Sequence, residues 1–185
     1  VVYDHIGEGA YDETERKIQE LLEERRVRLG EKGEVAKDIS KPAGVVVADP
    51  SQVGSPEIYF GASRNEYLGN GAIGYVGSQN LAELSKINLN RLYLVGDWNM
   101  QPEYAENKSA NAKIIFRYKA KNVYFVASAP RPIKVKIFVD GVSRGELIVQ
   151  SDQLYNVLSD SAYGEHMLEL RIEEPGLRAF TFTFG

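Results

Sequence analysis

Few residues in this 185-residue chain could carry out covalent or redox chemistry. The chain contains no cysteine, which excludes disulfides, thiol catalysis and thiolate metal sites within these residues. Its only two histidines, His5 and His166, lie near opposite ends of the sequence, so a histidine-rich metal site is also excluded. A cation site built from carboxylates alone stays open. We therefore assign no catalytic residue, no cofactor and no metal ligand from the sequence.

A pair of carboxylates could act as glycosidase residues, because glycoside hydrolysis uses two acids that flank the scissile bond. Glu173 and Glu174 are adjacent before a Pro-Gly turn, so we expect their side chains to point apart into solvent. Glu103 and Glu106 lie in one predicted loop, where the sequence identifies no partner for either. A Ser–His–Asp arrangement has no local motif in its support. The sequence thus predicts that this chain is not an enzyme.

Aromatic side chains beside polar ones are the better candidates, since sugar-binding sites stack a ring against a sugar face and bond its hydroxyls. Trp98, the only tryptophan, follows Gly96 and Asp97 at the end of a predicted strand. The interpretation that we favour for Trp98 itself places it in the core of the fold. His166, in register with Leu168, is best explained as a structural strand residue. The candidate ligand-binding residues are Trp98, Asp97, Tyr67 and Tyr104.

The overall composition is that of an ordinary globular protein, with 43% hydrophobic and 26% charged residues. The net charge of −4 and the lack of a basic run argue against nucleic acid as a partner. No apolar run approaches the ~20 residues that span a bilayer. The sequence begins without an initiator methionine or a signal-peptide pattern, so we expect it to be a piece of a longer protein.

Residues 12–29 have the pattern of an amphipathic helix, preceded by a short predicted strand at 1–6 and a glycine turn at 7–9. Asp12 and Glu15 have capping-box spacing, and Gly30 suits the end of the helix. Because an isolated helix of this length is marginal in water, its apolar face should be covered by the rest of the chain or by a second copy. A homodimer through this helix is therefore possible, and the apolar residues are Ile18, Leu21, Leu22 and Leu29.

The remainder predicts a mainly β domain, organised around residues 111–126. Alternation of apolar and polar residues there predicts two strands, joined by a short turn at 120–122. In all, the sequence predicts about nine short strands from Ile58 onward, with a hairpin signal at Asp140-Gly141 and a long Gly- and Asn-rich loop at 65–80. This pattern is typical of an antiparallel β-sandwich or jelly-roll.

Two sets of motifs resemble one known architecture. The segment VVYDHIGEGAYDETERKIQELL is similar to the last strand and helix of a thioredoxin-like fold. The series SPEIYFG, GDW…PEYA, ANAKIIFRYKAKNVYFVAS, VKIFVDG and GEHMLELRIEEPGLRAFTFTFG resembles the C-terminal region of DipZ-type proteins. These are cytochrome c biogenesis-like envelope proteins in which a thioredoxin-like domain precedes a jelly-roll similar to carbohydrate-binding modules. The Cys-x-x-Cys motif of that family lies upstream of this point.

The resemblance implies three segments: the tail of a thioredoxin-like domain at 1–30, a Gly- and Pro-rich linker at 31–57, and a carbohydrate-binding-module-like sandwich at 58–185. It implies a non-catalytic accessory module of an extracytoplasmic thiol–disulfide oxidoreductase. The expected partners are a glycan or an envelope protein, together with the thioredoxin-like domain of the parent. The alternative is a scaffold that docks the redox domain or its partners without binding sugar.

Overall fold

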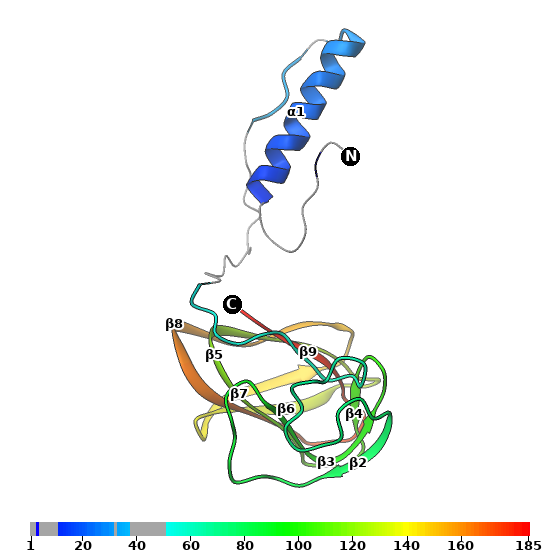
Figure 1. Cartoon of the computed structure of the whole chain (residues 1–185), viewed down its shortest axis with the longest axis vertical. Coiled ribbons are helices and arrows are strands. Elements are labelled where there is room, and N and C mark those ends of the chain that lie inside the picture. Colours follow the sequence, from blue (N-terminus) through cyan, green and yellow to red (C-terminus); the bar gives the residue numbers. More distant parts are fainter. Residues whose placement is uncertain (1–2, 4–10, 32, 38–50) are drawn as a thin grey trace. The chain divides into compact units, whose positions relative to one another are not determined.

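The computed structural model describes residues 3, 11–31, 33–37 and 51–185. The chain divides into two compact units, Val1–Val46 and Val47–Gly185, with the division inside the predicted linker (Figure 1). The predicted N-terminal strand, apart from Tyr3, and the glycine turn lie outside the described residues. Within the described part, no helix combines the length and the hydrophobicity that a membrane span needs.

The first unit contains the helix α1, Tyr11–Leu29, which confirms the amphipathic helix predicted over 12–29. Gly30 adopts a φ of 65°, and the Glu31 N–H donates back to the Arg26 carbonyl, so the chain leaves the helix through a left-handed residue as predicted. The four side chains predicted to form its apolar face are 36–57% exposed. That a second copy of the chain covers this face remains a prediction.

The second unit is an antiparallel β-sandwich with nine strands, and it confirms the predicted mainly β fold. Its strands are β1 Ile58–Tyr59, β2 Gly77–Leu81, β3 Leu92–Met100, β4 Ala105–Asn107, β5 Ala112–Ser128, β6 Ile133–Val139, β7 Val142–Val149, β8 Gln153–Ile172 and β9 Arg178–Phe184.

Two long strands, β5 and β8, connect the two halves of the sandwich. The first half of β5 pairs with β3, whereas the second half pairs with β9, and β8 follows β5 along both halves. Because β4 joins β3 to β9, strands β3, β5, β9 and β4 form a closed circuit of pairings. Beyond it, β6 and β7 extend the sheet from the second half of β8, and β1 adds to β9.

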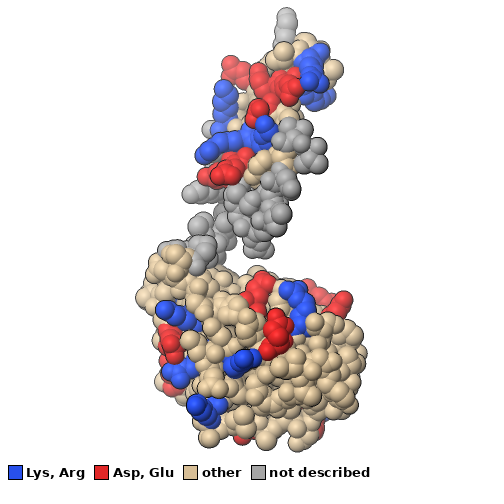
Figure 2. Space-filling model, in the orientation of Figure 1, with Lys and Arg blue, Asp and Glu red and all other residues tan. Residues whose placement is uncertain are grey.

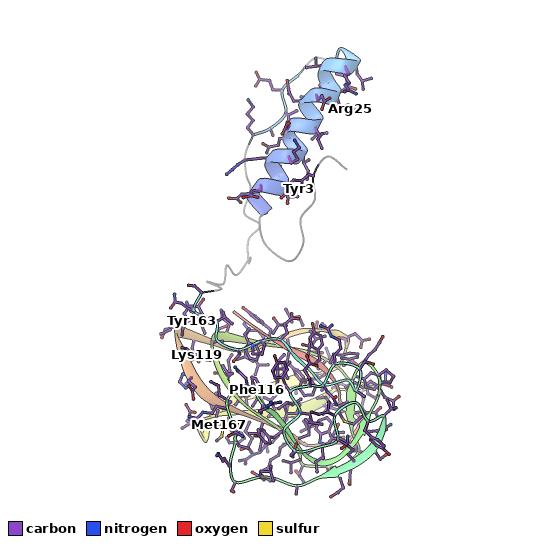
Figure 3. The ribbon with its side chains drawn as sticks, in the orientation of Figure 1. Tyr3, Arg25, Phe116, Lys119, Tyr163 and Met167 are labelled. Carbon is purple, nitrogen blue, oxygen red and sulfur yellow. The ribbon has the colours of Figure 1, made fainter. Side chains whose placement is uncertain are left out.

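One hydrophobic core fills the sandwich. Phe116 lies among the interior side chains in Figure 3, and its ring stacks on Phe184 at a centroid distance of 5.5 Å. Asn107 is one of the buried polar residues: it accepts hydrogen bonds from the Gly176 and Leu177 N–H groups and donates to the Ser109 and Glu174 carbonyls. These four bonds offset the cost of burying an amide.

The predicted turn at 120–122 was wrong. β5 continues through it, and the pairing with β8 shifts between Ala120 and Asn122 instead. A bulge absorbs the extra residues without ending the strand, so a short polar interruption in the sequence mimics a turn. For the same reason, the two strands predicted at 153–159 and 166–172 are the single strand β8. The predicted loops at 65–80 and 99–109 hold part of β2 and all of β4.

Candidate functional site

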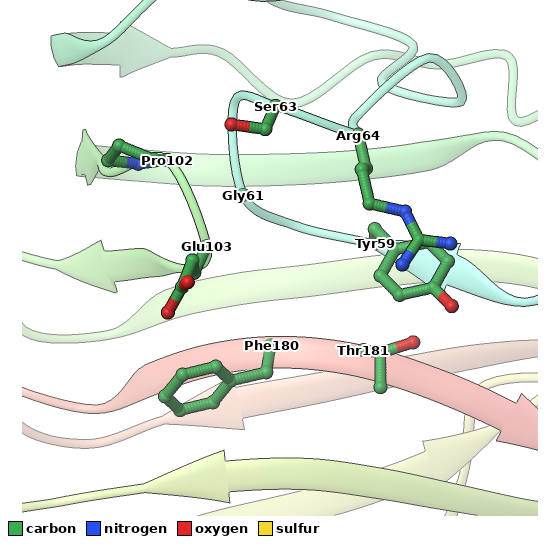
Figure 4. Close-up of a pocket in the computed structure, with 8 residues that line it drawn as sticks. All are labelled: Tyr59, Gly61, Ser63, Arg64, Pro102, Glu103, Phe180 and Thr181. Atoms are coloured by element: carbon green, nitrogen blue, oxygen red, sulfur yellow. The ribbon is translucent and has the colours of Figure 1, made fainter.

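A pocket of about 440 Å³ opens at one edge of the β-sandwich (Figure 4). This volume lies within the ~300–1,000 Å³ that is usual for small-molecule sites. Three parts of the chain form it: β1 with the loop that follows, the turn between β3 and β4, and β9. Its lining residues are Tyr59, Gly61, Ser63, Arg64, Pro102, Glu103, Phe180 and Thr181.

Backbone hydrogen bonds hold the two loops of the pocket together. The Ala62 N–H donates to the Gln101 carbonyl at 2.8 Å, and the Ser63 N–H donates to the Pro102 carbonyl at 3.0 Å. Gly61 permits this close approach, because a Cβ atom there would lie only 2.3 Å from the backbone carbon of Glu103. The pocket is therefore formed before any ligand arrives, which lowers the entropic cost of binding.

Arg64 and Tyr59 form one wall of the pocket. The guanidinium carbon of Arg64 lies 3.4 Å from the centroid of the Tyr59 ring, and Figure 4 shows the guanidinium group across the ring face. The Tyr59 hydroxyl donates to the Glu57 carboxylate; this bond, together with burial and the negative charge of Glu57, raises the pKa of Tyr59. The charge of Arg64 and a hydrogen bond from Arg64 to Tyr59 oppose this rise in pKa. A guanidinium stacked on a ring keeps further N–H groups at its rim that can donate to a ligand.

Glu103 and Phe180 form the opposite wall (Figure 4). The Phe180 ring packs against Tyr104, with centroids 5.4 Å apart, and the Arg178 guanidinium lies 5.4 Å from the Tyr104 centroid. Within the described part of the chain, neither Arg64 nor Glu103 forms an ion pair. The pocket thus places donors on one wall and acceptors on the other, with an aromatic ring beside each.

The four residues predicted to bind a ligand are spread over the molecule. Trp98 is fully buried, and its indole N–H donates to the Val95 carbonyl at 3.1 Å, so its ring is a core group and offers no face to solvent. Asp97 is exposed and accepts a hydrogen bond from the Asn80 amide. Tyr67 packs partly against the core, while Tyr104 supports Phe180 at the back of the pocket.

Other titratable groups are used structurally. Nδ1 of His166 lies 2.7 Å from the Asp140 carboxylate, which also accepts the Met167 N–H at 2.9 Å. Burial raises the pKa of Asp140, but these two hydrogen bonds outweigh it and the pKa is lowered. Glu173 pairs with Lys136 and Glu174 with Arg131, so the adjacent carboxylates point apart as predicted.

Catalytic arrangements are not evident in the described residues. No serine hydroxyl there has a hydrogen bond with His166, and no cluster of three or more His, Asp or Glu side chains could hold a metal ion. The pocket contains one carboxylate, whereas glycoside hydrolysis ordinarily uses two.

Sequence reasoning missed most of the pocket. In the sequence, Tyr59 is one tyrosine among several and Glu103 one carboxylate among several. The alternating pattern around Phe180 predicts only a strand. Arg64 and Thr181 carry no local motif. The one usable signal was Gly61 directly after the strand of SPEIYFG, since an isolated glycine beside a strand often marks a close backbone approach.

The chain is similar to two curated proteins named DipZ, from Mycobacterium bovis and Mycobacterium tuberculosis. Each is 27% identical over 182 residues, which cover 97% of this chain. The chain spans about a quarter of the length of these relatives.

Similarity to solved structures is weaker. A family 6 carbohydrate-binding module matches 60% of this chain and 93% of its own, at 16% identity and a TM-score of 0.36. A family two carbohydrate esterase from Clostridium thermocellum matches 46% of this chain and 28% of its own, at 17% identity and a TM-score of 0.43.

A family model described as "Thioredoxin like C-terminal domain" matches residues 55–185, which is the whole β-sandwich. This match and the similarity to DipZ confirm the resemblance predicted from the sequence. The chain belongs to the thioredoxin-like C-terminal domain family.

Proposed function

We propose that this chain is a non-catalytic accessory module of an extracytoplasmic, DipZ-type thiol–disulfide oxidoreductase, and that it binds carbohydrate through the Tyr59–Phe180 pocket. One observation carries the proposal: Arg64 and Glu103, neither with an ion-pair partner in the described residues, face a preformed pocket that also holds two aromatic rings. An envelope location follows from the resemblance and is part of the proposal.

The polar groups of the pocket suit hydroxyl groups. A guanidinium held flat can donate two parallel hydrogen bonds, so Arg64 matches two neighbouring oxygens of a sugar. A carboxylate only accepts, so Glu103 matches a hydroxyl that donates. The Phe180 ring is half-buried and can cover an apolar sugar face.

The test is binding of the purified chain to a glycan array, followed by isothermal titration calorimetry with each glycan that binds. Arg64→Ala should abolish or strongly weaken binding. Arg91→Ala is the matched control, because its guanidinium also lies over a tyrosine, at 5.9 Å from the Tyr67 centroid, away from the pocket. If the array shows no binding, or if Arg64→Ala leaves binding unchanged, the proposal is wrong.

The redox part of the proposal has its own test. Because this chain has no thiol to cycle, it should show no activity above background in an insulin-reduction assay. Turnover would contradict the accessory role.

A scaffold that docks the redox domain is the second candidate. It is favoured by three apolar side chains, Ile73, Tyr75 and Val76, which are 50–56% exposed in the loop before β2. This loop is held in shape, since the Gly74 N–H donates to Asn65 and the Ala72 N–H donates to Gln79. Val76→Ser should weaken binding of a purified DipZ thioredoxin-like domain in calorimetry if this surface is the docking site, and glycan binding should be unaffected.

A further inference from the structure

The sheet that carries the pocket has an outer surface of a particular composition. Tyr59 on β1 pairs with Thr181 on β9, which pairs with Val126 on β5, which in turn pairs with Leu154 on β8. A single row of side chains therefore crosses four strands. Its first two members, Tyr59 and Thr181, already line the pocket.

Alternation along the strands shows that this row faces outward. Phe125, Phe182 and Tyr155, the neighbours of the row in sequence, are buried in the core. Successive side chains of a strand point to opposite faces, so Val126 and Leu154 lie on the outer face, and Leu154 is 55% exposed. A parallel row follows on the same face, because Tyr124 pairs with both Thr183 and Asn156.

Neither row contains a charged residue. With strands ~4.8 Å apart, the first row extends about 14 Å from the pocket across the sheet. Its side chains are hydroxyl-bearing next to the pocket, at Tyr59 and Thr181, and apolar beyond it, at Val126 and Leu154. The parallel row carries hydroxyl and amide groups. The Thr181 hydroxyl donates to the Phe182 carbonyl, so it can still accept a hydrogen bond from a ligand.

We infer that the pocket is one end of a longer binding track, and that the ligand is an uncharged oligosaccharide whose chain runs from Tyr59 across β9 and β5 to Leu154. This inference rests on the proposed function. A sugar ring combines an apolar face with a rim of hydroxyl groups, and the two rows together offer apolar side chains beside hydroxyl and amide groups. Beyond the pocket, a charged polymer would gain no partner from the two rows and would lose solvation.

The test compares short and long probes by titration calorimetry: cellobiose with cellohexaose, xylobiose with xylohexaose, and mannobiose with mannohexaose. For the sugar series that binds, the hexasaccharide should bind at least tenfold more tightly than the disaccharide. Leu154→Asp should reduce hexasaccharide affinity to that of the disaccharide and leave disaccharide affinity unchanged. Ile148→Asp, which places the same charge at a similarly exposed position on β7, should change neither affinity.

The outcomes separate the two proposals. Binding that depends on Arg64 but not on chain length, or a length effect that survives in Leu154→Asp, would overturn the track and leave the pocket standing. Absence of binding by every probe would overturn both. Circular dichroism checks that Leu154→Asp is folded, and Leu154→Ser, which adds no charge, should give a smaller loss in the same direction.

Discussion

The two outer faces of the β-sandwich differ in their content of charged side chains. On the half formed by β6, β8 and the first part of β5, charged side chains form ion pairs: Lys113 with Glu83 and Glu169, Arg117 with Glu165, and Lys136 with Glu173. On the half that extends from the pocket, the rows from Tyr59 to Leu154 and from Thr183 to Asn156 contain none. In the view of Figure 2, blue and red side chains of this unit likewise lie in small groups, and wide areas hold neither.

One hydrophobic core thus supports two kinds of outer surface, one ion-paired and one uncharged. Exposed ion pairs contribute little to stability, on the order of 0–1 kcal/mol each, but they keep a sheet face soluble and unattractive to other sheets. An uncharged face gives up that protection. It is the better surface for a ligand, because covering an unpaired charge would cost free energy.

The largest effect should come from the core that both faces share. Trp98→Ala removes a fully buried ring and should lower the free energy of unfolding by about 3–5 kcal/mol. Chemical denaturation with tryptophan-independent circular dichroism would measure it. A variant as stable as the parent chain would show that the indole is not a core group and would reopen its interpretation as a sugar platform.

The next effect concerns the pocket, on the uncharged side. Arg64→Ala should cost about 1.5–3 kcal/mol of glycan binding, the range for a hydrogen bond to a charged group, while the melting temperature stays close to that of the parent. A matched fall in stability and binding would instead indicate that Arg64 acts by holding Tyr59 in place.

The helix α1 offers a third contrast, because its apolar side chains Ile18, Leu21, Leu22 and Leu29 are exposed. If they form a dimer, Leu22→Asp should convert the chain to a monomer in light scattering and leave the circular dichroism of the β-sandwich unchanged. A parent chain that is already monomeric at high concentration would contradict the predicted homodimer.

A smaller effect is expected on the ion-paired face. Lys113→Ala removes contacts to Glu83 at 2.8 Å and Glu169 at 3.6 Å, and should destabilise by less than about 1 kcal/mol. The hydrogen bond to Glu83 is the main cause of the raised pKa of Lys113. Its contribution is therefore present below the ordinary lysine pKa and is lost as pH rises through the raised value. Added salt should shrink the difference, and a salt-independent loss would point to packing instead.

The smallest effect is the acid dependence of Asp140. Because its pKa is lowered in the folded state, its contribution to stability is present above the ordinary value of 3.8 and is lost as pH falls through the lowered pKa. Denaturation at a series of acidic pH values should show a shallower slope for Asp140→Asn than for the parent. Identical slopes would mean that the contacts to Met167 and His166 do not hold the carboxylate in its charged form.

The sequence by itself determined the class of fold, the helix and its end, and the absence of thiol chemistry. Period-two alternation in β6 reports directly which side chains face the core, since a strand with one buried face has no other way to pattern its residues. In β9 a register shift interrupts the alternation, and Phe180 lines the pocket. Gly30 ended the helix where a left-handed residue was needed. These are local properties, so a local pattern suffices.

Only the tertiary structure decided where the site lies. Arg64, Glu103 and Phe180 are far apart in the chain, and the pairing of β1 and β4 with β9 brings them together. The same holds for the row from Tyr59 to Leu154, whose members come from four strands. Register between strands depends on the whole core and on bulges such as that at Ala120, which sequence periodicity does not reveal. Trp98, prominent in the sequence because it is unique, was placed in the core by packing, which follows the volume available and not the rarity of a residue.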